Sequence, residues 1–102
     1  MTEADQHQPE VFEAYWGRDQ VDALFTDLER HAKVTHVQIR TLSDSQPRNS
    51  TVTLECAREM LDDSHVKAIQ IHYEFDGDSW CDTLVLMPES IRIVRTTVPF
   101  DR

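Results

Sequence analysis

The chain has 102 residues, of which 39% are hydrophobic, and this size and composition fit one globular domain with its own core. Ten lysine and arginine residues stand against nineteen aspartate and glutamate residues, and the resulting net charge of −9 repels a phosphate backbone, which argues against nucleic acid as a partner. No apolar run approaches the length of a membrane span, and the N-terminus is acidic where a secretory signal would be basic, so we expect a cytoplasmic protein that binds no membrane.

The N-terminal part of the chain predicts a short tail followed by a helix. Residues 1–8 are polar and lack periodicity, which indicates a disordered tail before a single α+β domain over residues 9–102. Pro9 and Glu10 suit the first turn of a helix, since the missing N–H of proline is harmless there and the helix dipole favours an acid. We expect Gly17 to break this first helical segment.

A second stretch carries the strongest helical pattern. Asp19 suits an N-cap position, and the apolar residues that follow it recur at the spacing of one helical face. That stripe consists of Val21, Leu24, Phe25 and Leu28. The pattern predicts an amphipathic helix that packs this face against the core.

After Lys33 the apolar period changes from helical to two, which predicts a strand over residues 34–42. Residues 43–49 have turn and loop composition. A second helix is expected to start at Thr51 or Thr53, with Leu54, Ala57 and Leu61 facing inward. A strand, a helix and a further strand in this order predict a parallel, right-handed crossover.

The last third of the chain predicts an antiparallel meander. Asp76-Gly77 is a favoured two-residue hairpin turn, and Pro88-Glu89 marks the next turn. These turns set a register that gathers one apolar face. Its members are Ile69, Ile71, Leu84, Leu86, Ile91 and Ile93. We therefore predict an α+β fold of order α-β-α-β-β-β, in which both helices pack on this face of a small four-stranded mixed sheet.

The same register places a charged pair on the face that should be the core. Asp82 lies opposite Arg95, beside Tyr73 and Trp80. A buried ion pair is weak evidence for stability, because desolvation can cancel its Coulomb attraction. Two interpretations stay open: a partly exposed structural pair at the end of the sheet, or a recognition patch. We name Tyr73, Trp80, Asp82 and Arg95 as the candidate binding residues.

The opposite, more polar face predicts only weak candidates for chemistry. Cys81 lies across from His72, which is the minimum geometry for a base-activated thiol, and His36 would complete a metal ligand set if the first two strands are neighbours. No close-spaced ligand pair supports a metal, so we expect neither a metal nor a cofactor. Cys56 should lie on a helix over the other face, which predicts no disulfide with Cys81.

These observations favour a non-enzymatic accessory or adaptor protein that binds another protein, as a monomer or a weak homodimer. The alternative is a small-molecule-binding protein or minor enzyme. It would use a pocket near Asp82 and Arg95, or the pair of His72 and Cys81. A deep pocket would favour this alternative, whereas an aromatic surface patch would favour the adaptor.

Overall fold

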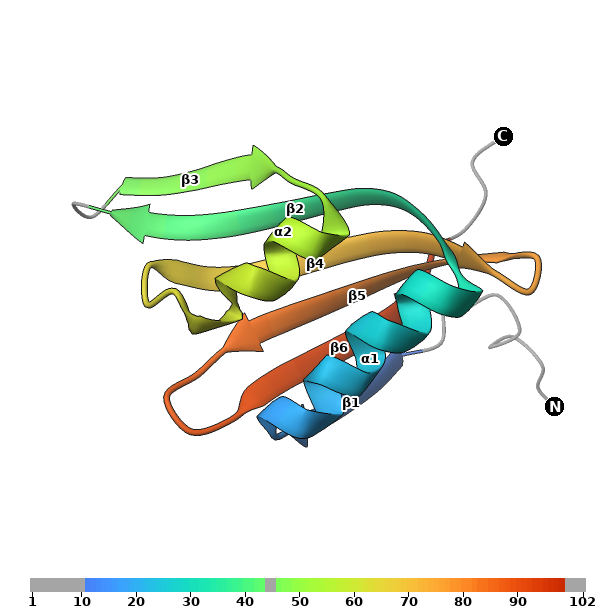
Figure 1. Cartoon of the computed structure of the whole chain (residues 1–102), viewed down its shortest axis with the longest axis horizontal. Helices are drawn as coiled ribbons and strands as arrows, with labels where there is room; N and C mark the ends of the chain where they lie inside the picture. The colour runs from blue at the N-terminus through green and yellow to red at the C-terminus, as the bar shows by residue number, and fades with distance from the viewer. Residues whose placement is uncertain (1–10, 44–45, 99–102) are drawn as a thin grey trace, which may run out of the picture.

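The computed structural model describes residues 11–43 and 46–98 of the chain. These residues form one sheet with the strand order β1-β6-β5-β4-β2-β3, in which all neighbouring strands are antiparallel (Figure 1). The elements in chain order are β1 (Val11–Trp16), α1 (Arg18–His31), β2 (Lys33–Ser43), β3 (Gln46–Thr51), α2 (Leu54–Glu59), the 3-10 helix η2 (Met60–Asp62), β4 (Val66–Phe75), β5 (Asp78–Leu86) and β6 (Ile91–Thr97).

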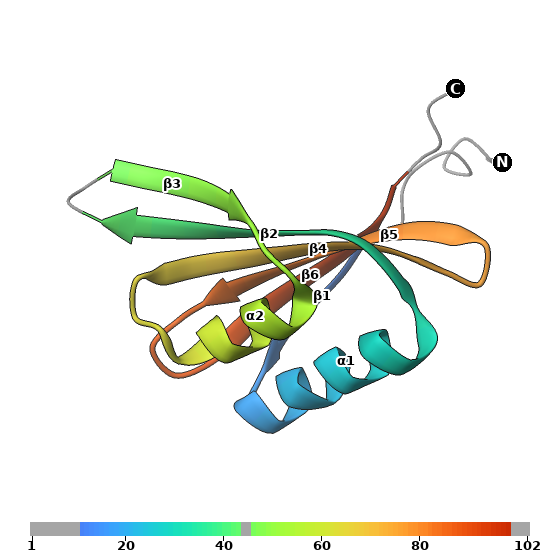
Figure 2. The same cartoon turned by 45° about the horizontal axis from the view of Figure 1, so that its top comes forward.

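Both helices lie on the same side of the sheet, as Figure 2 shows, and the other side is open. This arrangement confirms the prediction that the helices pack on one face. The apolar stripe of α1 is buried against apolar residues from the central strands. The buried sheet residues in this core include Val37, Ile39, Ile69, Ile71, Leu84 and Ile93. The predicted face residues Leu86 and Ile91 are partly buried at its margin.

The helix α1 starts at Arg18, with Gly17 as its N-cap, so Asp19 lies in the first turn and is not the predicted cap. The side chain of Gln20 accepts a hydrogen bond from the Gly17 N–H at 3.1 Å, which satisfies a donor at the helix start. An acid in the first turn still interacts favourably with the helix dipole. The second helix begins close to the predicted start at Thr51 or Thr53, because Thr53 is its N-cap and Thr53 Oγ1 accepts a hydrogen bond from the Cys56 N–H at 3.0 Å.

The prediction of a four-stranded sheet is wrong, because the sheet has six strands. The first additional strand is β1, in a segment for which the sequence predicted a helix. The predicted first turn at Pro9 and Glu10 and the predicted tail at residues 1–8 lie outside the described residues. In β1, Phe12, Tyr15 and Trp16 fit a helical spacing as well as an extended chain, and pairing with β6 decides in favour of the strand.

The second additional strand is β3, which pairs with β2 where the sequence predicted a loop. This hairpin reverses the chain before α2. As a result β2 and β4 are antiparallel neighbours, and the predicted parallel crossover is wrong. The polar sequence of residues 46–51 has no apolar alternation, so only its pairing with β2 identifies it as a strand.

The predicted register of the C-terminal meander is confirmed. Asp76 and Gly77 both have positive φ angles, 55° and 85°, as a type I′ turn requires. Tyr73 consequently faces Trp80, and Asp82 faces Arg95. Every other residue of β4, β5 and β6 then projects toward the helices.

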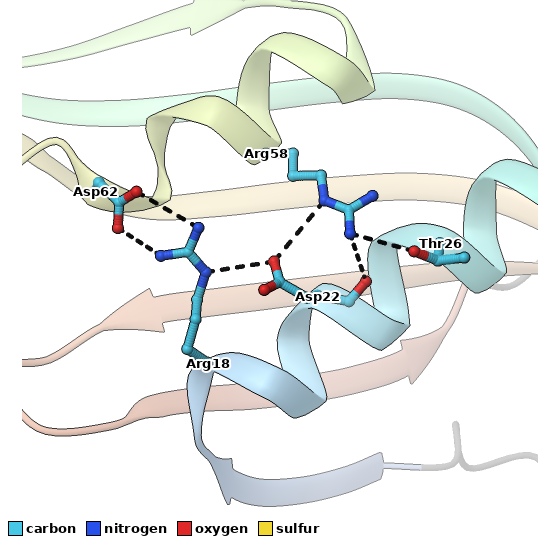
Figure 3. Close-up of polar contacts among 5 residues, drawn as sticks. All are labelled: Arg18, Asp22, Thr26, Arg58 and Asp62. Atoms are coloured by element: carbon cyan, nitrogen blue, oxygen red, sulfur yellow. Dashed lines mark hydrogen bonds and ion pairs between the residues drawn. The ribbon is translucent and has the colours of Figure 1, made fainter.

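A polar network on the surface joins the two helices (Figure 3). Arg18 of α1 forms an ion pair with Asp62 of η2 and another with Asp22. From α2, Arg58 Nη2 donates hydrogen bonds to the Asp22 carbonyl oxygen at 3.1 Å and to Thr26 Oγ1 at 3.2 Å. These contacts fix the spacing of the helices over the sheet.

Replacing Arg58 tests how much this network stabilises the packing of the helices. Arg58→Met keeps most of the aliphatic stem but removes both hydrogen bonds from α2 to α1. We expect the free energy of unfolding to fall by about 1 kcal/mol, because these bonds are partly exposed to water. Urea denaturation measures the change, and Arg30→Met on the exposed side of α1 is the control. An equal loss in both variants would contradict the bridging role of Arg58.

Candidate functional site

The predicted binding residues meet around a buried carboxylate. Asp82 of β5 is fully buried, and Arg95 of β6 binds it with two hydrogen bonds, Nε to Oδ1 and Nη2 to Oδ2, each 2.9 Å long. The Tyr73 hydroxyl of β4 donates a third hydrogen bond to Oδ1 at 3.1 Å. The three residues come from three adjacent strands, and the meander register places all of them on the helix-covered face.

This environment changes how the two partners of Asp82 titrate. Burial raises the pKa of the Tyr73 phenol, and the negative charge of Asp82 raises it further. The hydrogen bonds to Asp82 raise the pKa of Arg95, against the opposing effect of burial. In the folded protein Tyr73 is therefore a neutral hydrogen-bond donor and Arg95 a cation, which is the state that balances a buried carboxylate.

The four predicted residues differ in their access to solvent. Tyr73 and Asp82 are buried, Trp80 is partly buried against the core, and the Arg95 side chain keeps 29% of its surface exposed. The Trp80 indole N–H has no acceptor among the described residues, so this side chain contributes packing. Arg95 is thus the member best placed to reach a partner, and the binding role of the group stays a prediction.

Arg95 connects this group to an exposed apolar surface on β1. Phe12 of β1 lies directly opposite Arg95 of β6. β1 forms one margin of the sheet, and three of its side chains are largely exposed: Val11 at 65%, Phe12 at 47% and Tyr15 at 61%. We call these three side chains, with the outward main chain of β1, the β1 edge.

The sequence does not predict the β1 edge, because the apolar spacing of this segment favours a helix. The signal that indicates a strand is composition, since Val, Phe, Tyr and Trp are all enriched in strands. The only charged residue of β1 is Glu13, whose carboxylate pairs with Arg92 Nε at 2.5 Å. Once the segment is extended, its two exposed aromatic residues project from opposite faces of the same edge.

A shallow hollow lies beside Arg95 at the C-terminal end of α1. Its volume is about 320 Å³. Apolar side chains from α1 and β4 form much of the wall, and Arg95 and His31 supply cationic or titratable groups. The lining residues are Leu24, Asp27, Leu28, His31, Ala32, Tyr73, Phe75 and Arg95. Of the two residues named for the predicted pocket, Arg95 lines this hollow, whereas Asp82 is fully buried and does not.

The open face of the sheet carries the predicted row of His36, His72 and Cys81. His36 lies opposite His72, with ring centroids 5.7 Å apart, and His72 lies opposite Cys81. The His72 Nε2 atom is 3.8 Å from Cys81 Sγ and 3.2 Å from Gln70 Oε1. The structure therefore brings together the three residues that the sequence singled out on this face.

The protonation states of this row do not suit a thiolate nucleophile. Burial raises the pKa of the Cys81 thiol, and burial together with the nearby His36 lowers the pKa of His72. A reactive pair needs the opposite shifts, toward a thiolate and an imidazolium. Within residues 11–43 and 46–98, no group of three or more His, Cys, Asp or Glu side chains is arranged to hold a metal ion. Cys56 and Cys81 are both free thiols.

Comparisons with family models, with curated proteins and with solved structures found no match to this chain. Within the part of the chain that the structure describes, neither helix has the length and apolar character needed to cross a membrane.

Breaking the buried pair should destabilise the fold. Arg95→Met leaves the Asp82 carboxylate without its cation, and we expect the free energy of unfolding to fall by about 3 kcal/mol, as for other buried pairs that lose one partner. Adding Asp82→Asn to this variant should restore part of the loss, because the amide carries no charge.

Arg92→Met on the same strand is the matched control. Its partner Glu13 is exposed, so the loss there should be much smaller than the loss for Arg95→Met. Guanidinium denaturation gives all the values. Equal losses in the two single variants would contradict a stabilising role for the Asp82–Arg95 pair.

The raised pKa of Tyr73 gives a prediction at alkaline pH. In a Tyr15→Phe variant Tyr73 is the remaining tyrosine, and its phenolate absorbance should not rise near pH ~10, where free tyrosine ionises. Because the folded pKa is raised, its contribution to stability is complete below about pH 10 and is lost as the pH rises toward the folded value. The same variant unfolded in urea should titrate near ~10. Ionisation of the folded protein at the ordinary pH would refute the buried hydrogen bond.

Proposed function

We propose that this protein is a cytoplasmic, non-enzymatic accessory or adaptor protein that binds another polypeptide chain by strand addition to β1. The observation that carries this proposal is the exposure of the β1 edge. Half of the large apolar side chains that are exposed in the described part of the chain lie on this one strand of six residues. Exposed apolar residues that gather at one place are typical of protein interaction sites.

The main chain of β1 supports strand addition in particular. Among the described strands β1 pairs only with β6, so the other side of its main chain presents N–H and C=O groups that an extended partner segment can bond. Natural proteins usually protect such an edge with lysine, proline or a bulge. β1 contains neither lysine nor proline, and its pairing with β6 has an unbroken register. Its one charged side chain, Glu13, is paired with Arg92, so this edge carries little protection against pairing.

One of the predicted residues around Asp82, Arg95, lies on β6, the strand that pairs with β1. Arg95 is held in place by two hydrogen bonds to Asp82 and lies opposite Phe12. A side chain that is fixed before binding loses little conformational freedom when a partner docks. Phe12, Tyr15 and Arg95 also belong to residue types that are enriched at interfaces. The candidate patch therefore contributes a positioned cation beside an aromatic anchor.

The hollow beside Arg95 favours a second candidate function, which is small-molecule binding. Apolar walls with a few polar groups are typical of ligand pockets, and this volume lies near the lower end of their range. Phe75, which is 48% exposed, lies on its rim. A ligand in this hollow would depend on Phe75 and not on Phe12, so one experiment distinguishes the two functions.

We expect Phe12→Lys to abolish capture of the binding partner. The substitution removes an exposed anchor and places a charge on an edge strand, where lysine discourages pairing. Tagged protein expressed in its own cell is isolated, and the stoichiometric partner is identified by mass spectrometry. The recovered partner should fall at least about tenfold, which corresponds to ~1.4 kcal/mol of binding free energy.

Phe75→Lys is the matched control, because the exposed fractions of the two phenylalanines are nearly equal, 47% and 48%. It should leave capture unchanged. Thermal unfolding of both variants checks that the fold is intact. Loss of capture with Phe75→Lys and not with Phe12→Lys would contradict strand addition at β1 and show that the protein partner binds near the hollow.

A further inference from the structure

We propose that the chain which β1 accepts is a second copy of this protein. The two β1 strands would pair antiparallel about a twofold axis perpendicular to the sheet, and the two sheets would become continuous. This inference rests on the proposed function, because it names the occupant of the β1 edge. It follows from the alternation of residues on β1, from their charges and from the position of the aromatic rings.

The alternation of β1 restricts how two copies can pair. Residues that face each other in neighbouring antiparallel strands project from the same face of the sheet. The residues of β1 on the helix-covered face are Phe12, Ala14 and Trp16, and those on the open face are Val11, Glu13 and Tyr15. The twofold axis keeps both helix layers on the same side. Each residue must therefore meet a residue from its own set.

Two of the allowed registers overlap nearly the whole strand, and charge selects between them. A register centred on Glu13 places two carboxylates opposite each other, which is destabilising. A register centred on Ala14 places the smallest side chain of β1 on the axis. It also keeps Glu13 beside its own Arg92 and opposite Tyr15 of the second copy. We therefore select the register centred on Ala14.

The selected register brings aromatic rings together on both sides of the axis. Phe12 faces Trp16 of the second copy, and the same contact repeats by symmetry. Within one chain these two rings already lie 6.5 Å apart at an interplanar angle of 57°. The dimer would therefore cluster four rings around the two Ala14 methyl groups. Facing aromatic pairs stabilise antiparallel strands.

The size and charge of this interface predict a weak, reversible dimer. The contact consists of one short strand from each copy, with roughly four to six main-chain hydrogen bonds, which places it below the usual ~1,200 Å² of a stable interface. Each copy carries a net charge of −9, so the copies repel each other at long range. Salt screens this repulsion, and dimerisation should therefore strengthen as the salt concentration rises.

Disulfide trapping tests the axis directly. In a Cys56→Ser background, which removes the partly exposed native thiol, Ala14→Cys places two thiols across the axis, within the distance that a disulfide spans. The double variant Val11→Cys/Tyr15→Cys keeps Glu13 and tests the rejected register, in which these two residues face each other across the two copies. Ser50→Cys on β3 tests random collision at the other sheet margin. Under mild oxidation, Ala14→Cys should form covalent dimer at least about tenfold faster than either control. A tenfold ratio corresponds to ~1.4 kcal/mol in favour of the selected register over the other arrangements.

Analytical ultracentrifugation of the unmodified chain supplies the second measurement. We expect a monomer–dimer equilibrium that shifts toward dimer in high salt. Phe12→Lys should weaken the affinity of dimerisation by about tenfold or more, and Phe75→Lys should leave this affinity unchanged. This inference would be overturned if the chain is a monomer at all concentrations and all three cysteine variants are trapped at equal rates.

The proposed function is judged separately. If the chain is monomeric but Phe12→Lys still abolishes capture of a different protein, β1 binds that protein and only the second copy is refuted. Faster trapping of Val11→Cys/Tyr15→Cys than of Ala14→Cys would refute the selected register. Both proposals would be refuted if the unmodified chain does not dimerise and Phe12→Lys does not reduce capture of any partner.

Discussion

The buried carboxylate of Asp82 constrains the sheet more than any other group. It needs a cation and a hydrogen-bond donor inside the core, and these come from Arg95 on β6 and Tyr73 on β4. A slip of one residue on any of the three strands would turn one partner to the open face and leave the carboxylate unpaired. The electrostatics of one residue therefore oppose register shifts across the centre of the sheet.

The same constraint extends to the margin of the sheet. β1 pairs with β6, and Phe12 lies across from the fixed Arg95. The edge strand is thus anchored on one side by a strand whose register is strongly specified. No other described strand pairs with its outer side, and Phe12 and Tyr15 of this strand are exposed. A rigid edge of this kind can add a strand with little loss of conformational entropy.

The parts of the fold that the sequence predicted have local signals. The stripe of α1 repeats at helical spacing, and Asp76-Gly77 specifies a two-residue turn, so the register of β4 with β5 and the meeting of Asp82 with Arg95 follow from short stretches of chain. These signals located the charged core of the candidate site. They did not show that α1 and the neighbouring strands would bury Tyr73.

The parts that the sequence did not predict depend on distant pairing. β1 is apolar at nearly every position and fits either period, and its partner β6 lies at the other end of the chain. β3 is polar and is defined only by its bonds to β2. The missed strands also changed the candidate site, because Phe12 became visible as a neighbour of Arg95 only when β1 was extended. Secondary-structure periodicity alone cannot supply such contacts.

The pairing of the β1 edge with another strand can be measured by amide hydrogen exchange along β1. Outward-facing amides of an unpaired edge exchange rapidly, whereas amides bonded to a second strand are protected. We expect the β1 amides to exchange more slowly as the protein concentration rises, while the exchange rates of the β3 amides at the opposite margin do not change. If the exchange rates of the β1 amides do not depend on protein concentration and do not change when captured partner is added, this edge does not pair with another strand.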